Sequence, residues 1–227
     1  RDYKVTGVQT CALPICWDIA EGPDGKLIEQ GVFGEAQVRP DGIEDVYLCV
    51  KPFTENPGGM PGHALLDFQF RADSPVVDGK GNQDSGLAVS MEVRFREGQV
   101  YDPIGSDEPQ PVVFQLGTWK DAIEKATVYD KNPLKRYKLN LSHEQKKALL
   151  TERLNTATQD HSQNLYDPVL NSCLSTAIDG VNLVLPESQK MPRVRPDGSM
   201  DPNAVLPVWS NKLFYKHGVI SKLGPDQ

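Results

Sequence analysis

Cys173 is the residue of this sequence whose setting best suits covalent chemistry. It follows Asn171 and Ser172, either of which can cap a helix, and it precedes apolar residues at helical spacing. Amide groups and the helix dipole stabilise an anion at a helix N-terminus, so a thiolate is favoured here. The position alone nevertheless favours the alternative, a buried structural cysteine, because a free cysteine usually packs as a small hydrophobic residue. Ala177 and Gly180, on the same side of the helix, are expected to leave room for a neighbouring strand.

His63 is the expected base for this thiol. It begins a strand after a glycine-rich loop and lies on the more polar face of that strand, a position that suits a general base. The alternative is a surface or capping histidine. A third polar group is expected to orient the imidazole, and a strand over 87–98 offers Ser90 and Glu92 on the matching face. Glu92 is the preferred candidate, whereas Asp67 is expected on a solvated face of the sheet.

The other histidines and the second cysteine of the main chain have no spacing that indicates a metal site. His143 lies at the first position of a capped helix and is expected to be solvated, and His161 and His217 lie in polar segments. Cys49 lies in a strand and is expected to be buried and inert. The sequence contains no HxH, HExxH, GxGxxG or P-loop pattern, so we expect no metal and no cofactor.

The elements that must position these residues change from strands to helices along the chain. Alternating apolar and polar residues predict strands over 31–38, 45–51, 63–70, 87–98 and 111–117. The strands precede the helices, which predicts an α+β domain in which an antiparallel sheet packs against helices.

Helix boundaries in the second half are marked by capping residues. Thr118 is the expected N-cap of a short helix over 118–130. Ser142 and Gln145, three residues apart, form a capping box for the next helix. The helix that begins at the cysteine is expected to end before Pro186.

Length and charge limit the classes of function. The chain has 227 residues, enough for one substantial domain with a sizeable core, and a net charge of −7. An acidic chain argues against nucleic-acid partners and against binding to anionic membrane surfaces by charge alone. No stretch approaches the roughly 18 apolar residues of a membrane span.

The first residues resemble the in-frame translation of a common short-read sequencing adapter, which spells Arg1 to Ile15 codon by codon. We therefore interpret residues 1–16 as adapter-derived, with Cys16 as a junction codon, and expect the native start of the gene and any signal peptide to be missing. The spacing of Cys11 and Cys16 is too wide for a redox CxxC pair and has no second pair for zinc.

Three stretches together resemble a bacterial family. They are "GHALLDFQF", "YKLNLSHEQKKALL" and "LYDPVLNSC", and they resemble the Lnb N-terminal periplasmic domain, a domain family of unknown function. Their order and spacing carry the resemblance over about His63 to Pro186. Ser172 departs from the family pattern, which often has Asn before the cysteine. We assign 17–186 to this domain and 187–227 to a proline-rich C-terminal extension of it.

The resemblance implies a permuted papain-like (NlpC-type) fold, in which the histidine strand precedes the cysteine helix. It implies Cys173 as nucleophile, His63 as base, a periplasmic or envelope location, and chemistry on acyl groups. The substrate would be an acyl-bearing lipid, a peptide or a cell-wall amide. The alternative is a non-catalytic binding or structural domain of the envelope, with Cys173 buried in the core.

Overall fold

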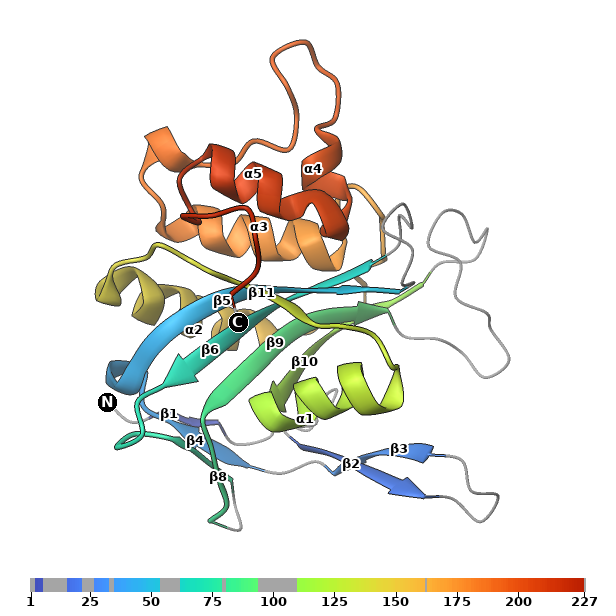
Figure 1. The fold of residues 1–227 in the computed structure, drawn as a ribbon, viewed down its shortest axis with the longest axis vertical. Helices are drawn as coiled ribbons and strands as arrows, with labels where there is room; N and C mark the ends of the chain where they lie inside the picture. Colours follow the sequence, from blue (N-terminus) through green and yellow to red (C-terminus); the bar gives the residue numbers. More distant parts are fainter. Residues whose placement is uncertain are drawn as a thin grey trace.

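A five-stranded antiparallel sheet forms the centre of the computed structural model (Figure 1). The structure describes residues 3–5, 16–21, 27–32, 35–53, 62–78, 81–93, 110–161 and 163–226. The strands lie in the order β10-β9-β6-β5-β11. They are β5 (Ile43–Pro52), β6 (Gly62–Phe70), β9 (Gly86–Val93), β10 (Val112–Thr118) and β11 (Lys135–Lys138). Together with the helices described below, this sheet confirms the predicted α+β class.

Helices cover the central sheet on both faces (Figure 1). One face carries α2 (His143–Ala157) and α3 (Cys173–Val184). Helix α3 packs on the alternate apolar residues of β6, such as Leu66 and Phe68, and α2 packs on β5, β10 and α3. The other face carries α1 (Trp119–Glu124), which continues as a π-helix, η2 (Lys125–Tyr129). The alternation of apolar residues in the sequence therefore reports correctly which residues of β6 face the main core.

Smaller sheets complete the architecture. One has the order β1-β4-β7-β8 and the other is the hairpin of β2 and β3. Their strands are β1 (Tyr3–Val5), β2 (Cys16–Glu21), β3 (Leu27–Val32), β4 (Ala36–Val38), β7 (Val76–Asp78) and β8 (Gln83–Asp84). The strand predicted over 31–38 is divided between β3 and β4, and β9 covers the predicted strand as far as Val93; residues 94–98 lie outside the described residues. Cys11 also lies outside them.

The predicted helix caps are present. The Thr118 side chain accepts a hydrogen bond from the Asp121 amide, and Ser142 forms a capping box with Gln145. These bonds satisfy amide groups that the first turn of a helix leaves without partners. The π-helical turn that follows α1 has no counterpart in the prediction, because its sequence is compatible with an ordinary helix.

Gly180 makes room for a side chain of α2, and our expectation that it makes room for a strand is wrong. A Cβ atom at Gly180 would lie 2.7 Å from Cζ of Arg153. Arg153 is buried and donates from Nη1 to the carbonyl oxygen of Thr176 at 3.0 Å. Ala177 lies in the hydrophobic core. The glycine thus allows a buried guanidinium to lie against α3.

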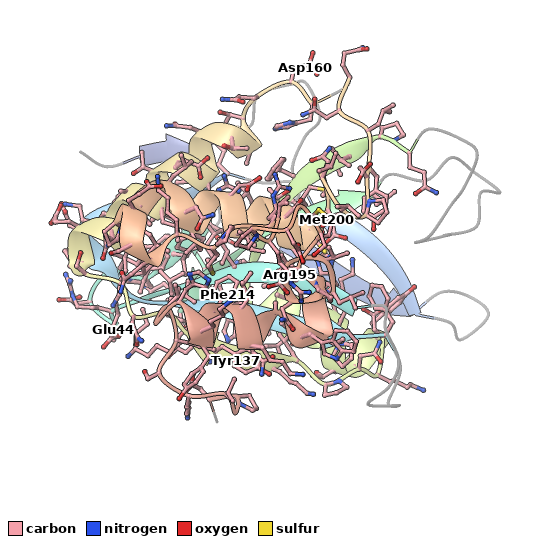
Figure 2. The ribbon with its side chains drawn as sticks, turned by 90° about the horizontal axis from the view of Figure 1, so that it is seen from above. Glu44, Tyr137, Asp160, Arg195, Met200 and Phe214 are labelled. Carbon is pink, nitrogen blue, oxygen red and sulfur yellow. The ribbon has the colours of Figure 1, made fainter. Side chains whose placement is uncertain are left out.

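The C-terminal segment belongs to the core. It contains η3 (Glu187–Gln189), α4 (Pro202–Val205), η4 (Pro207–Trp209) and α5 (Ser210–Lys216). Helices α3 and α5 run side by side above the sheet (Figure 2). Phe214 of α5 is fully buried, and Val219 and Ile220 are nearly so. These side chains complete the apolar layer on this side of the sheet.

Asp67 is buried, and our expectation that it lies on a solvated face is wrong. The face of β6 that carries Asp67 is covered, and Arg136 donates from Nη2 to Asp67 Oδ2 at 2.7 Å. The guanidinium lies 4.0 Å from the ring centroid of Tyr47 and 4.4 Å from that of Trp119. Burial raises the pKa of Asp67 to about 6, although the charge of Arg136 acts in the opposite direction.

Replacing Asp67 with Asn is expected to alter stability in a pH-dependent way. Because the pKa of Asp67 is raised to about 6, the folded protein retains a proton that the unfolded chain releases between about pH 4 and 6. The stability from this group is complete below pH 4 and is lost as the pH rises through 6, by about 3 kcal/mol. Asp67→Asn cannot ionise, so its free energy of unfolding relative to wild type should improve by about that amount between pH 4 and 7 in urea titrations.

Asp73→Asn is the matched control, because the Asp73 side chain is 77% exposed. Its difference from wild type should be nearly constant over this range. A pH-independent difference for Asp67→Asn would contradict the raised pKa.

Candidate active site

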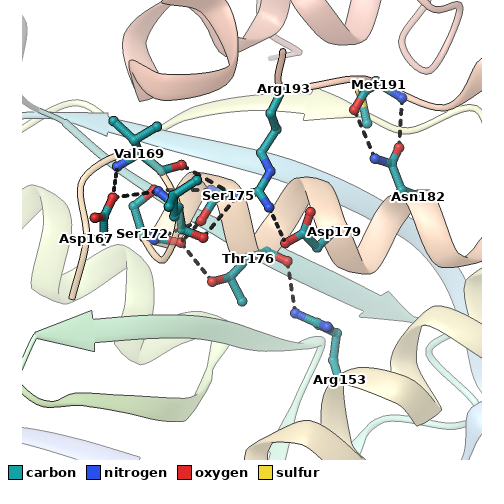
Figure 3. A network of polar contacts seen from close by, with 11 residues as sticks. Arg153, Asp167, Val169, Ser172, Ser175, Thr176, Asp179, Asn182, Met191 and Arg193 are labelled. Carbon is teal, nitrogen blue, oxygen red and sulfur yellow. Dashed lines mark hydrogen bonds and ion pairs between the residues drawn. The ribbon is translucent and has the colours of Figure 1, made fainter. Parts of the chain in front are cut away.

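Cys173 is the first residue of α3, and the cap that precedes it is a reciprocal pair of serines (Figure 3). The Ser175 amide donates to Ser172 Oγ at 3.2 Å, and the Ser172 amide donates to Ser175 Oγ at 2.8 Å. Of the two caps that the sequence allows, the structure uses Ser172; Asn171 instead donates from its side chain to the Leu165 carbonyl oxygen. Cys173 itself is a free, half-buried thiol at the positive end of the helix dipole.

His63, Ser90 and Glu92 come together because β6 and β9 are antiparallel neighbours. Their pairing includes Leu66 opposite Val89, and continuing this register places His63 opposite Glu92. His63 Nε2 lies 3.0 Å from Glu92 Oε1 and 2.6 Å from Ser90 Oγ. Ser90 Oγ donates to Glu92 Oε1 at 2.7 Å. Residues two apart on a strand share a face, so Ser90 and Glu92 reach the same imidazole nitrogen.

The thiol of Cys173 lies at the position where β6 and β9 separate. The Ala64 amide donates to Cys173 Sγ at 3.4 Å. Among the described residues, Ala64 is paired with Val50 of β5 and with no residue of β9. The Cys173 sulfur, at the start of α3, therefore accepts a hydrogen bond from the segment of β6 next to His63. Among the described residues, β9 does not pair with this segment.

The charges of His63, Glu92 and Cys173 stabilise one another. Burial alone lowers the pKa of His63, but the negative charges of Glu92 and Cys173 and hydrogen bonds to both raise it to about 10. Burial raises the pKa of Glu92, but the charges of His63 and Lys125 and the hydrogen bonds from His63 and Ser90 lower it to about 2. At neutral pH the imidazolium and the carboxylate are therefore the favoured forms.

A cavity of about 60 Å³ adjoins the imidazole on the face of the sheet that carries α1. His63, Ser90 and Glu92 line it together with Lys51 and Lys125. The sequence analysis did not single out the two lysines. Lys51 is opposite His63 in the hairpin of β5 and β6, so register alone could have identified it. Lys125 lies in the π-helical turn, which no sequence pattern marked.

The remaining candidates lie apart from this cluster. Cys49 is fully buried, and burial together with the nearby charge of Asp67 raises its pKa well above the usual thiol value. His143 is exposed at the start of α2, as expected. In the part of the chain that the structure describes, no three His, Cys, Asp or Glu side chains form a group that could hold a metal ion.

The family of the chain follows from a comparison with family models. The model described as the Lnb N-terminal periplasmic domain matches residues 29–202, a range that contains His63, Ser90, Glu92 and Cys173. The chain belongs to the Lnb N-terminal periplasmic domain family. The family is described as a periplasmic domain, which confirms the expected periplasmic or envelope location. No curated protein and no solved structure matches the chain. Within the described residues, no helix has the length and apolar character needed to cross a bilayer.

Removing the cap before the cysteine is expected to destabilise α3. Ser172→Ala deletes the acceptor for the Ser175 amide, so the free energy of unfolding should fall by about 1 kcal/mol in urea titrations. Ser172→Asn retains a capping oxygen and should remain within a few tenths of a kcal/mol of wild type. Equal stability of Ser172→Ala and wild type would contradict the role of this cap.

Neutralising Glu92 is expected to lower the pKa of His63. Glu92→Gln removes the largest influence that raises this pKa, so the value should fall from about 10 by about 1–3 pH units. NMR titration of the His63 ring resonances measures the change. Glu124→Gln, on the exposed part of α1, is the control and should leave the titration of His63 unchanged. An unchanged pKa in Glu92→Gln would contradict the ion pair.

Proposed function

We propose that this domain is a thiol enzyme of the bacterial envelope that acts on acyl groups, with Cys173 as nucleophile, His63 as general base and Glu92 as the group that orients His63. The observation that carries the proposal is the hydrogen-bonded series from the carboxylate of Glu92 through the imidazole to the thiol at a helix N-terminus. Each member favours the charged form of the next, which is the arrangement that activates a weak nucleophile.

The chemistry begins from a charge-separated pair, in which His63 already holds the proton of the Cys173 thiol. The thiolate then attacks the carbonyl carbon of an ester or amide, and the carbonyl oxygen gains the negative charge. Backbone N–H groups at the start of α3 are suited to receive this oxyanion, since the first turn of a helix has amides without intrahelical partners. His63 returns its proton to the leaving alkoxide or amine, and an acyl thioester on Cys173 remains.

The second half of the cycle determines the class of enzyme. An amine that attacks the thioester makes the domain an acyltransferase, and water makes it a hydrolase such as an amidase or peptidase. In both cases His63 removes the proton of the attacking group, and the thiolate of Cys173 is the leaving group. An acyltransferase and a hydrolase would both pass through the thioester on Cys173. The acyl donor can be a lipid, a peptide or a cell-wall amide. The permuted papain-like relationship is consistent with this order of His63 before Cys173 and is part of the proposal.

Alkylation by iodoacetamide tests the activated thiol. Cys173 should react at pH 6–7, where an ordinary thiol with a pKa of about 8.5 is mostly protonated. Its rate should exceed that of Cys49 at least about tenfold, because Cys49 is fully buried. Mass spectrometry of peptides after short exposures measures both sites in one sample.

His63→Ala should slow the alkylation of Cys173 at pH 6–7 and leave Cys49 unreactive. His143→Ala, an exposed histidine at the start of α2, is the matched control and should react as wild type does. If Cys173 reacts no faster than Cys49, or if His63→Ala does not change its pH profile, the domain is instead a binding or structural module.

A further inference from the structure

We propose that Ser90 is a positioning residue that, together with Glu92, holds His63 as the tautomer protonated on Nε2 and leaves Nδ1 to exchange a proton with Cys173. The inference rests on the proposed function for the step at Cys173, but the tautomer itself can be measured without that function. It assigns to Ser90 a role that differs from that of Glu92, which supplies the charge.

The assignment follows from the number of hydrogens available. Glu92 Oε1 is 2.7 Å from Ser90 Oγ, and an ionised carboxylate only accepts, so the single hydroxyl hydrogen of Ser90 is used in this bond. Ser90 Oγ is also 2.6 Å from His63 Nε2, and the hydroxyl has no second hydrogen to fill that contact. The hydrogen must therefore be on Nε2.

The distance to Glu92 agrees with this arrangement. Nε2 lies 3.0 Å from Glu92 Oε1, so one N–H is shared between the hydroxyl and carboxylate oxygens. The opposite tautomer would place an unshared pair of Nε2 against two oxygen atoms at 2.6 and 3.0 Å. The single hydroxyl hydrogen of Ser90 could then fill only one of the three contacts among Nε2, Ser90 Oγ and Glu92 Oε1, and the other two would be repulsive, which disfavours that tautomer in the folded protein.

The charged groups around His63 also favour the tautomer protonated on Nε2. They are Glu92 on β9, Cys173 on α3, Lys51 on β5 and Lys125 on η2. The ammonium groups of Lys51 and Lys125 only donate hydrogen bonds. Among the described residues that line the cavity, the carboxylate of Glu92 is therefore the anion that can accept from Nε2–H. The thiol then interacts with the other nitrogen, Nδ1.

With Nε2 protonated, Nδ1 is free to exchange a proton with Cys173. When the charge-separated pair forms, Nδ1 of the imidazole takes the proton of the Cys173 thiol, which leaves a thiolate and the imidazolium that is favoured at neutral pH. The bond of Nε2–H to Ser90 and Glu92 stays in place throughout, and it strengthens when the ring becomes positive. Ser90 thus prevents the Glu92 side chain, which is 30% exposed, from turning away from the ring between steps.

Nitrogen NMR of histidine-labelled protein tests the tautomer directly. In Cys173→Ala, at a pH above the midpoint of the His63 titration, we expect Nε2 protonated and Nδ1 bare. In Ser90→Ala,Cys173→Ala we expect a measurable population with the proton on Nδ1. A ring protonated on Nδ1 in Cys173→Ala, or identical spectra with and without the hydroxyl, would overturn the proposal. This readout requires no reactive thiol, so it is independent of the proposed function.

The pH profile of Cys173 alkylation tests the effect on the thiol. Ser90→Ala should lower the rate at pH 6.5 about tenfold, the loss expected for one charge-assisted hydrogen bond. Ser90→Thr keeps the hydroxyl and should remain within about twofold of wild type. Ser85→Ala, an exposed serine in the turn before β9, is the control and should have no effect. An unaltered profile for Ser90→Ala, with a reactive Cys173 in wild type, would overturn the role of Ser90 and leave the proposed function intact.

Discussion

The antiparallel register of β6 and β9 is the constraint on which the candidate site depends. It aligns His63 with Glu92 and brings Ser90 to the same face, so three polar side chains meet without any specialised loop. A shift of β9 by one residue would turn Ser90 and Glu92 to the apolar face of the sheet, away from His63. The alternating apolar residues of the two strands, which cover that core, fix the register and therefore the site.

The same face of β6 carries two charged clusters with different surroundings. Near the start of the strand, the carboxylate of Glu92 is partly exposed and pairs with His63. Further along, Asp67 is fully buried and pairs with Arg136 between two aromatic rings. Burial acts to raise both carboxyl pKa values. At Asp67 it outweighs the charge of Arg136, whereas at Glu92 the charges of His63 and Lys125 and the hydrogen bonds from His63 and Ser90 together outweigh it. One cluster thereby lies next to Cys173, and the other joins β6 to β11 and to Trp119 of α1.

Local patterns in the sequence predicted the strands, the helix caps and the polar face that unites His63 with Ser90 and Glu92. These features depend on period and on residue type over a few positions, which a single sequence contains. Asp67 was assigned wrongly because its burial depends on Arg136, which is far away in the chain. The same reason applies to Gly180, whose neighbour Arg153 comes from another helix. The bond from the Ala64 amide to Cys173 joins residues 109 positions apart and had no local sign.

The C-terminal segment affects the order of events when the chain is made. Leu213, Phe214, Val219 and Ile220 are part of the same apolar layer as β5 and β6, although they are synthesised after the sheet and α3. Until they emerge from the ribosome, the sheet and α3 have an incomplete apolar covering, and the layer cannot close around Phe214. The apolar layer of this domain therefore closes only after residues 213–220 have been synthesised.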